Sequence, residues 1–339
     1  MRWRGGCTAV LVAASLLALV LLWTVSRVTP LRSSPLVHIP LHVDALEGGD
    51  ADRPPRVFVL IVSSYSRASF ARRETVRSTW LQFAREAQGV VVEHRFVLGQ
   101  ASWDVPPWTM WRLARESAKH DDLVFVPSVD TYGSLSMKTW LSMQLASLVD
   151  ADFVIKTDDD CYVRLDTMLD EMPSWPREGY WSGLVNSFIP PLRDSSNKNS
   201  DWSYPYKFFP PFTAGAMHVM SGDVVRRLAA NRHRKLLMPR NEDQALGLWL
   251  FALLGHGPVH DRRIQQWHTC EDDLIVKHFF RNFDDLPMED MHSNVLNGRP
   301  LCTGFQQRVC AACYPCQGRE TDYADWGYGC SNVDGLYLL

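Results

Sequence analysis

Three successive aspartates, Asp158, Asp159 and Asp160, are the side chains of this sequence best suited to hold a metal ion. They follow the mostly apolar run 153–156, and a short run of this kind predicts a buried strand. We therefore expect the carboxylates at the carboxyl end of a strand, where open α/β sheets place their ligand site. Adjacent carboxylates repel one another and are costly to bury unpaired. A solvated acidic turn is the alternative, but hard oxygen ligands on a rigid edge suit Mg²⁺ or Mn²⁺ together with substrate phosphates.

A second acidic pair, Glu242 and Asp243, directly precedes the apolar stretch 245–254. Acidic residues in the first turn of a helix complement its dipole and bond its free N–H groups, which is one explanation for the pair. A carboxylate at a helix start that faces a ligand site is also well placed to act as a general base. His278 ends a short predicted strand that begins at 273, and a structural histidine and a metal ligand both fit this position.

The elements that must position these side chains alternate along the chain. Such alternation predicts an α/β fold with a mostly parallel, Rossmann-like sheet flanked by helices. The sequence contains no Gly-rich phosphate loop of the Walker or dinucleotide type. The segment 180–212 is irregular and aromatic, and either core packing or a sugar-binding surface explains its rings. We expect strands over 56–63, 90–98, 123–126, 153–156, 215–220 and 273–276, and helices over 70–83, 107–119, 131–148, 165–172, after Ser221 and over 245–254.

Length and composition restrict the class of protein. With 339 residues, 46% hydrophobic and 22% charged, the chain has the composition of a globular protein with one large domain or two small ones. The net charge of −3 and the lack of a Lys/Arg tract argue against nucleic acid as a partner. Thirteen tryptophans supply the flat faces that a carbohydrate-handling protein needs, although they can equally be core residues.

The amino terminus predicts a membrane anchor. Arg2 and Arg4 precede the uncharged run 7–25, which as a helix spans about 28 Å, close to a bilayer's hydrocarbon core. A cleaved signal peptide is the alternative, but its apolar core is shorter. We expect a type II arrangement with a cytosolic tail, a signal-anchor, a stem, a catalytic domain and a Cys-rich extension, at residues 1–6, 7–25, 26–55, 56–305 and 306–339.

Seven cysteines lie outside the predicted anchor, five of them near the carboxyl terminus. In a secretory lumen this density predicts disulfides. The group Cys310, Cys313, Cys316 and Cys330 also allows a zinc site, although its spacing is not that of a common zinc module. Because seven is an odd number, we predict that Cys161, next to the aspartates, is the free thiol.

Six sequence segments occur in the order found in one enzyme family. They are R-x-x-x-R-x-T-W at 73–80, D-x-Y-x-x-L-x-x-K-T at 130–139, K-x-D-D-D at 156–160, Y-W-x-G at 180–183, E-D at 242–243 and V-K-H at 276–278 followed by Cys302. Together they resemble the β1,3-galactosyltransferase and β1,3-N-acetylglucosaminyltransferase family (glycosyltransferase family 31) over residues 56–302. The chain departs from the family pattern at Ser134, where the family has a glycosylated Asn, at 216–218, where it has Gly-Gly-Tyr, and at Gln244, which replaces the usual Val.

The resemblance implies a GT-A fold and an inverting transfer from a UDP-sugar. It implies Asp160 and His278 as metal ligands, with Asp158 assisting through water or the ribose. It implies Asp243 as the catalytic base and Glu242 as an acceptor contact or support. By position, Cys270 and Cys302 are expected to form a disulfide. The residues implied to touch the nucleotide or to balance the acids are Arg73, Arg77, Asp130, Lys138, Lys156, Asp158 and Asp159.

From these residues we expect a hexosyltransferase that uses Mn²⁺ or Mg²⁺. The donor is UDP-galactose or UDP-N-acetylglucosamine, the new linkage is β1,3, and the acceptor is a glycan on a glycoprotein, a glycolipid or an anchor. The expected location is the Golgi membrane, with the ER as an alternative, and a monomer or a homo-oligomer both remain open. An inactive lumenal carbohydrate-binding protein or chaperone on the same fold is the alternative function, motivated by the altered 216–218 stretch. A metal-dependent phosphotransferase or nucleotidyltransferase is a third, disfavoured by the missing phosphate loop.

Overall fold

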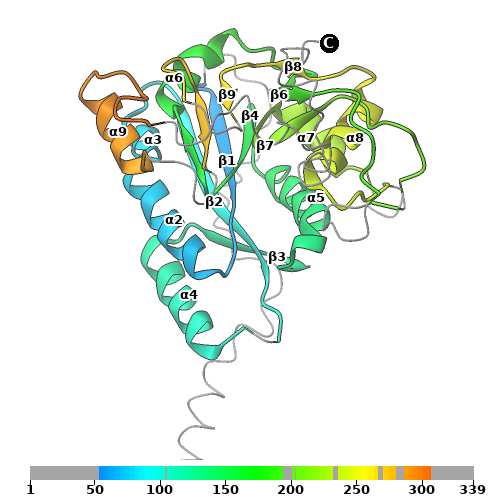
Figure 1. Cartoon of the computed structure of the whole chain (residues 1–339), viewed down its shortest axis with the longest axis horizontal. Coiled ribbons are helices and arrows are strands. Elements are labelled where there is room, and N and C mark those ends of the chain that lie inside the picture. The colour runs from blue at the N-terminus through cyan, green and yellow to red at the C-terminus, as the bar shows by residue number, and fades with distance from the viewer. Residues whose placement is uncertain are drawn as a thin grey trace, which may run out of the picture. The chain divides into compact units, whose positions relative to one another are not determined.

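A seven-stranded sheet forms the centre of the fold in this computed structural model, in the strand order β3-β2-β1-β4-β7-β6-β8 (Figure 1). The structure describes residues 53–103, 105–193, 201–202, 204–231, 236–265, 270–279 and 286–306. The strands of this sheet are β1 (Arg56–Val62), β2 (Val91–Gln100), β3 (Leu123–Val129), β4 (Phe153–Asp158), β6 (Trp181–Asn186), β7 (Phe212–Ser221) and β8 (Val259–His260).

Six of these strands run in one direction. β1 pairs in parallel with β2 and β4, and β2 pairs in parallel with β3. β7 is antiparallel to both β4 and β6, and β8 is parallel to β6. The mostly parallel sheet predicted from the alternating pattern is therefore confirmed. The direction of β7 is set by long-range pairing with β4 and β6, so the local sequence does not indicate it.

Helices cover both faces of the sheet. On one face, Phe70 and Leu113 from α2 and α4 pack with Val57, Val59 and Ile61 of β1, while α5, α7 and α8 lie on the other side (Figure 1). The helices are α2 (Arg67–Ser78), α3 (Gln82–Glu86), α4 (Pro107–His120), α5 (Leu135–Ala146), α6 (Leu165–Glu171), α7 (Gly222–Ala229), α8 (Glu242–Leu254) and α9 (Met288–Leu296), with two 3-10 turns, η1 (Tyr132–Ser134) and η2 (Met172–Ser174).

Cap residues determine where the two helices nearest the predicted site begin and end. Ser66 precedes α2, and its side chain accepts a hydrogen bond from the Ser69 N–H. Asn241 precedes α8 and accepts from the N–H groups of Asp243 and Gln244, which orients the first turn of this helix. Gly255 ends α8 with a φ of 76°, a left-handed conformation that glycine adopts without steric cost.

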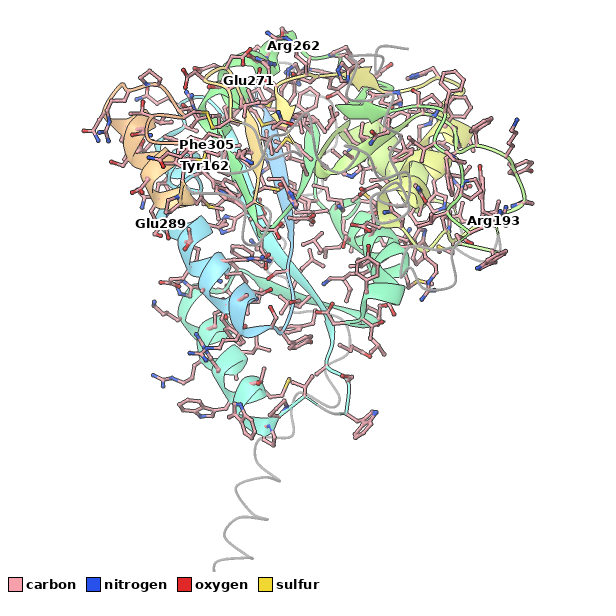
Figure 2. All side chains as sticks on the ribbon, in the orientation of Figure 1. Tyr162, Arg193, Arg262, Glu271, Glu289 and Phe305 are labelled. Atoms are coloured by element: carbon pink, nitrogen blue, oxygen red, sulfur yellow. A yellow bond between two sulfur atoms is a disulfide. The ribbon has the colours of Figure 1, made fainter. Side chains whose placement is uncertain are left out.

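A small second sheet lies beside the main one, in the order β5 (Cys161–Val163), β10 (Val276–His278) and β9 (Ile264–Gln265). β5 follows β4 after a two-residue turn, and β10 is antiparallel to it. The Tyr162 hydroxyl of β5 forms a hydrogen bond with His292 Nδ1 of α9 at 3.2 Å. This contact joins the small sheet to α9, and Tyr162 is labelled in Figure 2. The small sheet therefore carries a late segment of the chain back to the end of β4.

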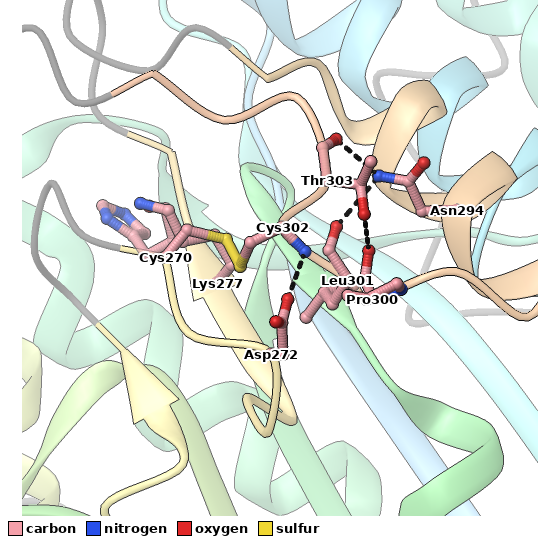
Figure 3. The surroundings of a disulfide bond; sticks show 9 residues. Cys270, Asp272, Lys277, Asn294, Pro300, Leu301, Cys302 and Thr303 are labelled. Atoms are coloured by element: carbon pink, nitrogen blue, oxygen red, sulfur yellow. Dashed lines mark hydrogen bonds between the residues drawn. A yellow bond between two sulfur atoms is a disulfide. The ribbon is translucent and has the colours of Figure 1, made fainter.

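A disulfide joins Cys270 to Cys302, with a Cα–Cα distance of 5.7 Å (Figure 3). The Cys302 N–H donates to Asp272 at 2.9 Å, so the same two segments are also joined by a hydrogen bond. The pairing predicted by position is confirmed. Cys161 is buried and free, also as predicted.

Some predictions concern residues outside the described part of the chain. This group comprises the anchor at 7–25, most of the stem at 26–55 and nearly all of the Cys-rich extension at 306–339 with its zinc alternative. All of them stay predictions. None of the helices formed by the described residues combines the length and the apolar character needed to cross a bilayer.

Some predictions about local structure were wrong. The helix expected over 70–83 is two helices, because α2 ends at Ser78, where Thr79 leaves the helical conformation, and α3 begins at Gln82. The segment 180–212 begins with the strand β6, where an irregular stretch was expected. β6 is buried at Trp181, Ser182 and Gly183 because β7 and β8 flank it. Its partners lie far along the chain, so tertiary pairing rather than local alternation specifies this strand.

Candidate active site

The three aspartates follow the carboxyl end of β4, as predicted. Asp158 pairs with Val62 at the end of the neighbouring parallel strand β1, and Asp159 and Asp160 form the turn into β5. Asp159 is buried and accepts a hydrogen bond from the Ser63 hydroxyl at 2.7 Å. The acids therefore lie at the sheet edge where two parallel strands end together.

Arg72 of α2 is the arginine that reaches the acidic turn. Its Nη1 lies 3.1 Å from Asp159 Oδ1 and 3.0 Å from Asp160 Oδ2. The sequence pattern drew attention to Arg73 and Arg77 instead. One residue along a helix turns the side chain by about 100°, so only the structure shows which of the adjacent arginines faces the acids.

His278 comes to the same turn from β10. It is the strand partner of Cys161, and the N–H of Phe279 donates to the backbone oxygen of Asp160 at 2.9 Å. His278 Nε2 lies 3.3 Å from Asp160 Oδ1. Ligand atoms of Asp160, Cys161 and His278 all lie within 4.8 Å of one another. The antiparallel pairing of two short strands thus joins residues that are distant in sequence.

The electrostatic environment shifts the pKa values of Asp158 and Asp160 in opposite directions. Burial, with the charges of Asp160 and Glu242, raises the pKa of Asp158 to about 7, although the charges of Lys156 and His278 act to lower it. The pKa of Asp160 is lowered overall. Burial acts to raise it, but the interactions with His278 and Arg72 outweigh burial. The side chains share one small volume and cannot all ionise without a compensating cation.

The donor set at this turn fits a divalent cation. Two ligands bound side by side to an octahedral Mg²⁺ at about 2.1 Å are about 3 Å apart, and Asp160 Oδ1 and His278 Nε2 are 3.3 Å apart. A carboxylate with an imidazole suits Mn²⁺ as well as Mg²⁺. Burial raises the pKa of the Cys161 thiol well above its usual range, so this group is a weaker ligand, because a metal binds the thiolate.

Lys156 is the buried cation at the centre of the acidic residues. Its side chain is fully buried and its Nζ lies 3.9 Å from Asp158 Oδ1. Burial lowers its pKa, but the charges of Asp158, Glu242 and Asp243 outweigh burial, so the net shift is upward. The Nζ has no hydrogen-bond partner among the described residues. Lys156 therefore links the acidic turn electrostatically to the start of α8.

Asp243 lies against the backbone of β7. A Cβ added at Gly215 would lie 2.8 Å from Asp243 Oδ1, so only glycine at 215 leaves room for this carboxylate. Burial raises the pKa of Asp243, with Lys156 and the Gly215 N–H acting in the opposite direction. Burial, and then the neighbouring Asp243, raise the pKa of Glu242 as well. A buried carboxylate with a raised pKa has the properties of a general base.

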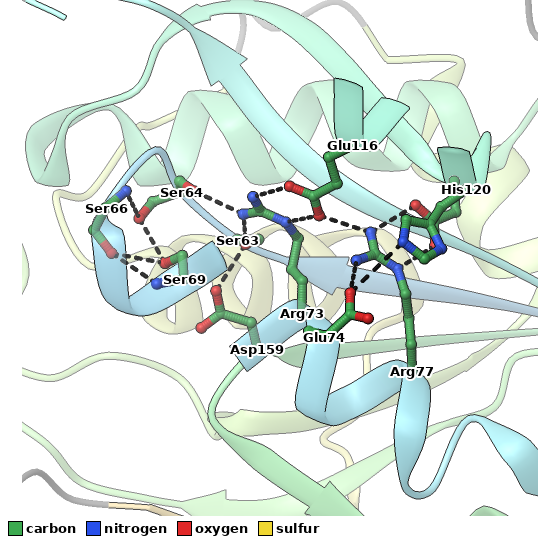
Figure 4. Close-up of polar contacts among 11 residues, drawn as sticks. Ser63, Ser64, Ser66, Ser69, Arg73, Glu74, Arg77, Glu116, His120 and Asp159 are labelled. Atoms are coloured by element: carbon green, nitrogen blue, oxygen red, sulfur yellow. Dashed lines mark hydrogen bonds and ion pairs between the residues drawn. The ribbon is translucent and has the colours of Figure 1, made fainter. Parts of the chain in front are cut away.

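Arg73 is held within the protein rather than at the acidic turn (Figure 4). Its Nε and Nη2 each donate to Glu116 at 2.7 Å, and its Nη1 donates to the Ser63 hydroxyl and to the Ser64 backbone oxygen, both at 2.8 Å. These contacts brace the loop after β1. The predicted contact of Arg73 with a nucleotide stays a prediction.

Arg77 forms the neighbouring ion pair. Its Nε and Nη2 donate to Asp122 at 2.7 and 2.8 Å, and Nη2 also donates to Glu116 at 2.8 Å. Burial raises the pKa of Asp122, but hydrogen bonds from His94 and Arg77 outweigh it and hold this pKa below its usual range. The contacts give Arg77 a structural role, and its predicted nucleotide contact also stays untested.

Replacing Asp122 by Asn should lower the free energy of unfolding by about 3–5 kcal/mol, because the buried Arg77 then loses the carboxylate that accepts two of its hydrogen bonds and keeps Glu116 as its closest remaining partner. The contribution of Asp122 should be full near neutral pH and decline below the ordinary Asp pKa of about 3.9, because protonation of a group with a lowered folded pKa favours the unfolded chain. Urea unfolding at several pH values measures both effects. The exposed pair of Arg262 and Asp273 is the control, and Asp273→Asn should cost less than about 1 kcal/mol. Equal losses in the two variants would contradict the structural role.

Asp130 and Lys138 form a pair close to the same edge. Lys138 Nζ lies 2.9 Å from Asp130 Oδ1 and also donates to the backbone oxygen of Ser63. Burial lowers the pKa of Lys138, although the negative charge of Asp130 acts to raise it. Asp130 Oδ2 is buried with no hydrogen-bond partner in the described residues. Ser63 thus connects this pair to Asp159, and Asp130 retains a free acceptor.

The rings of the segment 180–212 divide between core and surface. Buried rings are those of Trp181, Tyr204, Phe209 and Phe212, while Phe188, Trp202, Tyr206 and Phe208 are exposed. Phe188 and Phe208 contact each other edge to face at 6.5 Å between centroids, and Lys207 lies over the Phe208 ring. Core packing therefore explains the buried rings, and the sugar-binding surface stays a prediction for the exposed ones.

Four residues of the site were not predicted from the sequence: Ser63, Arg72, Gly215 and His218, whose Nε2 lies 3.5 Å from Asp243 Oδ1. The positions of Ser63 and Arg72 beside matched segments were the available signal. For Gly215 and His218 the signal was the departure at 216–218, which marked the stretch without assigning a role.

Comparisons with known proteins place the matched segments in one family. The galactosyltransferase family model ("Galactosyl_T: Galactosyltransferase") matches residues 71–255, more than half of the chain. The Arabidopsis thaliana protein "Beta-1,3-galactosyltransferase GALT1" is 31% identical over 239 residues, which are 67% of this chain and 36% of that protein. The Mus musculus protein "Beta-1,3-galactosyltransferase 6" is 30% identical over 68% of this chain and 72% of its own length.

Other comparisons are looser. The Danio rerio protein "Lactosylceramide 1,3-N-acetyl-beta-D-glucosaminyltransferase A" is 30% identical over 54% of this chain and 51% of its own. The chain spans 36–40% of the length of three Arabidopsis thaliana relatives. Among solved structures, mouse xyloside xylosyltransferase 1 matches with a TM-score of 0.38 and 10% identity over 67% of this chain and 98% of that chain, a similarity too low to support an argument.

Proposed function

This chain belongs to the galactosyltransferase family, and on that premise we propose that it is an inverting glycosyltransferase of the GT-A type that transfers a hexose from a UDP-sugar to a glycan hydroxyl. The observation that carries the proposal is the arrangement around buried Lys156. Lys156 interacts electrostatically both with Asp158, which belongs to the same turn as the possible metal ligand Asp160, and with the buried carboxylate of Asp243. Transfer with inversion needs both groups.

The reaction is a single displacement. The oxygen of the acceptor hydroxyl attacks C1 of the donor sugar on the face opposite the diphosphate, and the bond from C1 to the phosphate oxygen breaks with its electron pair going to UDP. Asp243 takes the proton of the attacking hydroxyl. Its raised pKa favours this role, and Glu242 in the same helix turn contacts or supports the acceptor.

Asp160 and His278 would hold the divalent cation, with Asp158 assisting. Mn²⁺ or Mg²⁺ bound there supplies positive charge to the diphosphate as it departs. Lys156 keeps the nearby acids from repelling one another. Arg72 contacts both Asp159 and Asp160, so we propose that Arg72 faces the diphosphate, while Arg73 and Arg77 brace the loop and helix that carry it.

We place the nucleotide part of the donor at the carboxyl ends of β1, β2 and β3. The free Oδ2 of Asp130 is a buried acceptor for a hydroxyl or N–H of the nucleoside. Lys138 orients Asp130, and Asp159 is oriented by Ser63. The exposed rings of Phe188 and Phe208 supply faces on which an acceptor sugar can stack.

The donor sugar is tested by turnover with the purified chain. UDP-galactose and UDP-N-acetylglucosamine should each be incubated with Mn²⁺ and a panel of glycan acceptors, and UDP release measured. We expect release that requires acceptor and is abolished by EDTA, with a β1,3 linkage in the product by NMR. Sugar binding without UDP release would instead favour an inactive carbohydrate-binding protein, and a phosphorylated product would favour a phosphotransferase.

The cellular setting is part of the proposal. An anchor at 7–25 would hold the catalytic domain in the Golgi lumen, where glycoprotein, glycolipid and anchor glycans are acceptors. Protease protection of a tagged chain in sealed Golgi vesicles tests this placement, and cleavage of the carboxyl-terminal domain without detergent would contradict it.

A further inference from the structure

His218 lies on an unusual part of β7. Between the pairs Gly183–His218 and Val185–Thr213, β6 has one residue and β7 has four. The extra residues form a bulge in β7 that brings the Thr213 and His218 side chains together, although four residues lie between them along the strand. The bulge includes Gly215, on which the Asp243 carboxylate lies.

The imidazole of His218 connects two side chains. Its Nδ1 hydrogen-bonds the Thr213 hydroxyl, and its Nε2 lies 3.5 Å from Asp243 Oδ1. Both Nε2 and Oδ1 are buried with no hydrogen-bond partner among the described residues. A separation of 3.5 Å is long for a hydrogen bond, but catalytic hydrogen bonds often tighten only when substrates are bound.

The surroundings of His218 determine its protonation. Burial lowers its pKa well below the usual range, and the charge of Lys156, its cross-strand partner, lowers it further against Glu242. A neutral imidazole carries one N–H. Since a carboxylate only accepts hydrogen bonds, Asp243 favours the tautomer with the proton on Nε2, and the Thr213 hydroxyl then donates to Nδ1.

We infer that His218 is a positioning residue for the reaction: its Nε2–H restrains the Asp243 carboxylate at Oδ1 and holds it toward the acceptor hydroxyl. The inference rests on the proposed role of Asp243 as the base. A neutral donor suits this task, because a second cation beside Asp243 would stabilise the carboxylate and weaken it as a base. The Thr213 hydroxyl holds the ring in place through its hydrogen bond to Nδ1.

Substitutions at 218 separate the hydrogen bond from the packing. His218→Met has similar bulk and no donor, so kcat should fall about 10- to 100-fold, a loss typical of misplaced catalytic groups, with KM for the UDP-sugar unchanged. His218→Gln places an amide N–H near the position of Nε2 and should keep kcat within about fivefold. Thr213→Val removes the hydrogen bond to Nδ1 but keeps the imidazole of His218, and it should also lower kcat. Equal losses for Met and Gln at 218 would overturn the inference.

A double-mutant cycle with Asp243→Asn tests whether His218 acts through Asp243. His218→Met should not lower the residual rate of the Asp243→Asn chain further, whereas a loss of the same factor in both backgrounds would show that His218 acts on the fold and would overturn the inference. The Asp243→Asn rate alone tests the base itself. Full activity in that single variant would reject the base, and the inference with it.

A readout without turnover is available from ring ¹⁵N chemical shifts of His218. The full chain should show a neutral imidazole with the proton on Nε2, and Asp243→Asn should weaken this preference. A protonated ring, or a proton on Nδ1 in the unsubstituted chain, would overturn the inference whichever UDP-sugar proves to be the donor.

Discussion

Asp243→Asn should lower kcat for glycosyl transfer by about 10²- to 10⁴-fold, the usual contribution of a positioned general base. The amide keeps the shape of the carboxylate but cannot take the proton of the acceptor hydroxyl. KM for the UDP-sugar should stay within about threefold, because Asp243 lies with α8 and β7 rather than at the acidic turn. Initial rates of UDP release with saturating acceptor measure the effect.

The matched control is Asp290→Asn. Asp290 also lies in the first turn of a helix, α9, but is exposed, so the same chemical change should leave kcat unaltered. Glu242→Gln should act mainly on the KM for the acceptor. If Asp243→Asn retained more than about a tenth of the activity while Glu242→Gln abolished it, the roles of the two acids would have to be exchanged.

Asp160→Asn should lower transfer activity about 10³-fold and raise the Mn²⁺ concentration needed for half-maximal rate. A bound cation supplies several kcal/mol of charge stabilisation to the departing diphosphate, and the neutral amide is a poorer ligand than a carboxylate. His278→Ala should show the same direction of change, since His278 Nε2 lies 3.3 Å from Asp160 Oδ1.

Metal binding itself is the second measurement, by calorimetric titration of Mn²⁺ in the presence of UDP. Asp166→Asn is the control, because Asp166 lies close by in the sequence but is paired with Arg164 at the surface. Unchanged Mn²⁺ affinity in Asp160→Asn would show that the cation binds elsewhere, whatever happens to the rate.

Residues whose role depends on nearby sequence were predictable. The apolar run before Asp158 indicated a strand end, and the polar residues before α8 together with Gly255 indicated the limits of that helix; all of these are confirmed. Membership of the family, expected from six short segments, is also confirmed. In each of these cases the signal lies within a few residues of the feature.

Features that depend on pairing across the chain were not predictable. The bulge in β7 is an irregularity in its pairing with β6, a strand that lies well before it in the sequence. The difference between Arg72 and Arg73 is a rotation of one residue on α2, and it decides which guanidinium meets the acidic turn and which meets Glu116. Neither distinction has a counterpart in composition or in hydrophobic spacing.

The Cys270–Cys302 bond has a consequence for recombinant production. It fastens the chain just before β10, the strand that supplies His278, to the turn after α9. Closing a loop with a sequence separation of 32 contributes about 3–4 kcal/mol by chain entropy. A bacterial cytosol keeps thiols reduced, so protein expressed there should lack this bond and hold β10, with His278, less firmly. Secretion into the periplasm or the medium should give the better preparation.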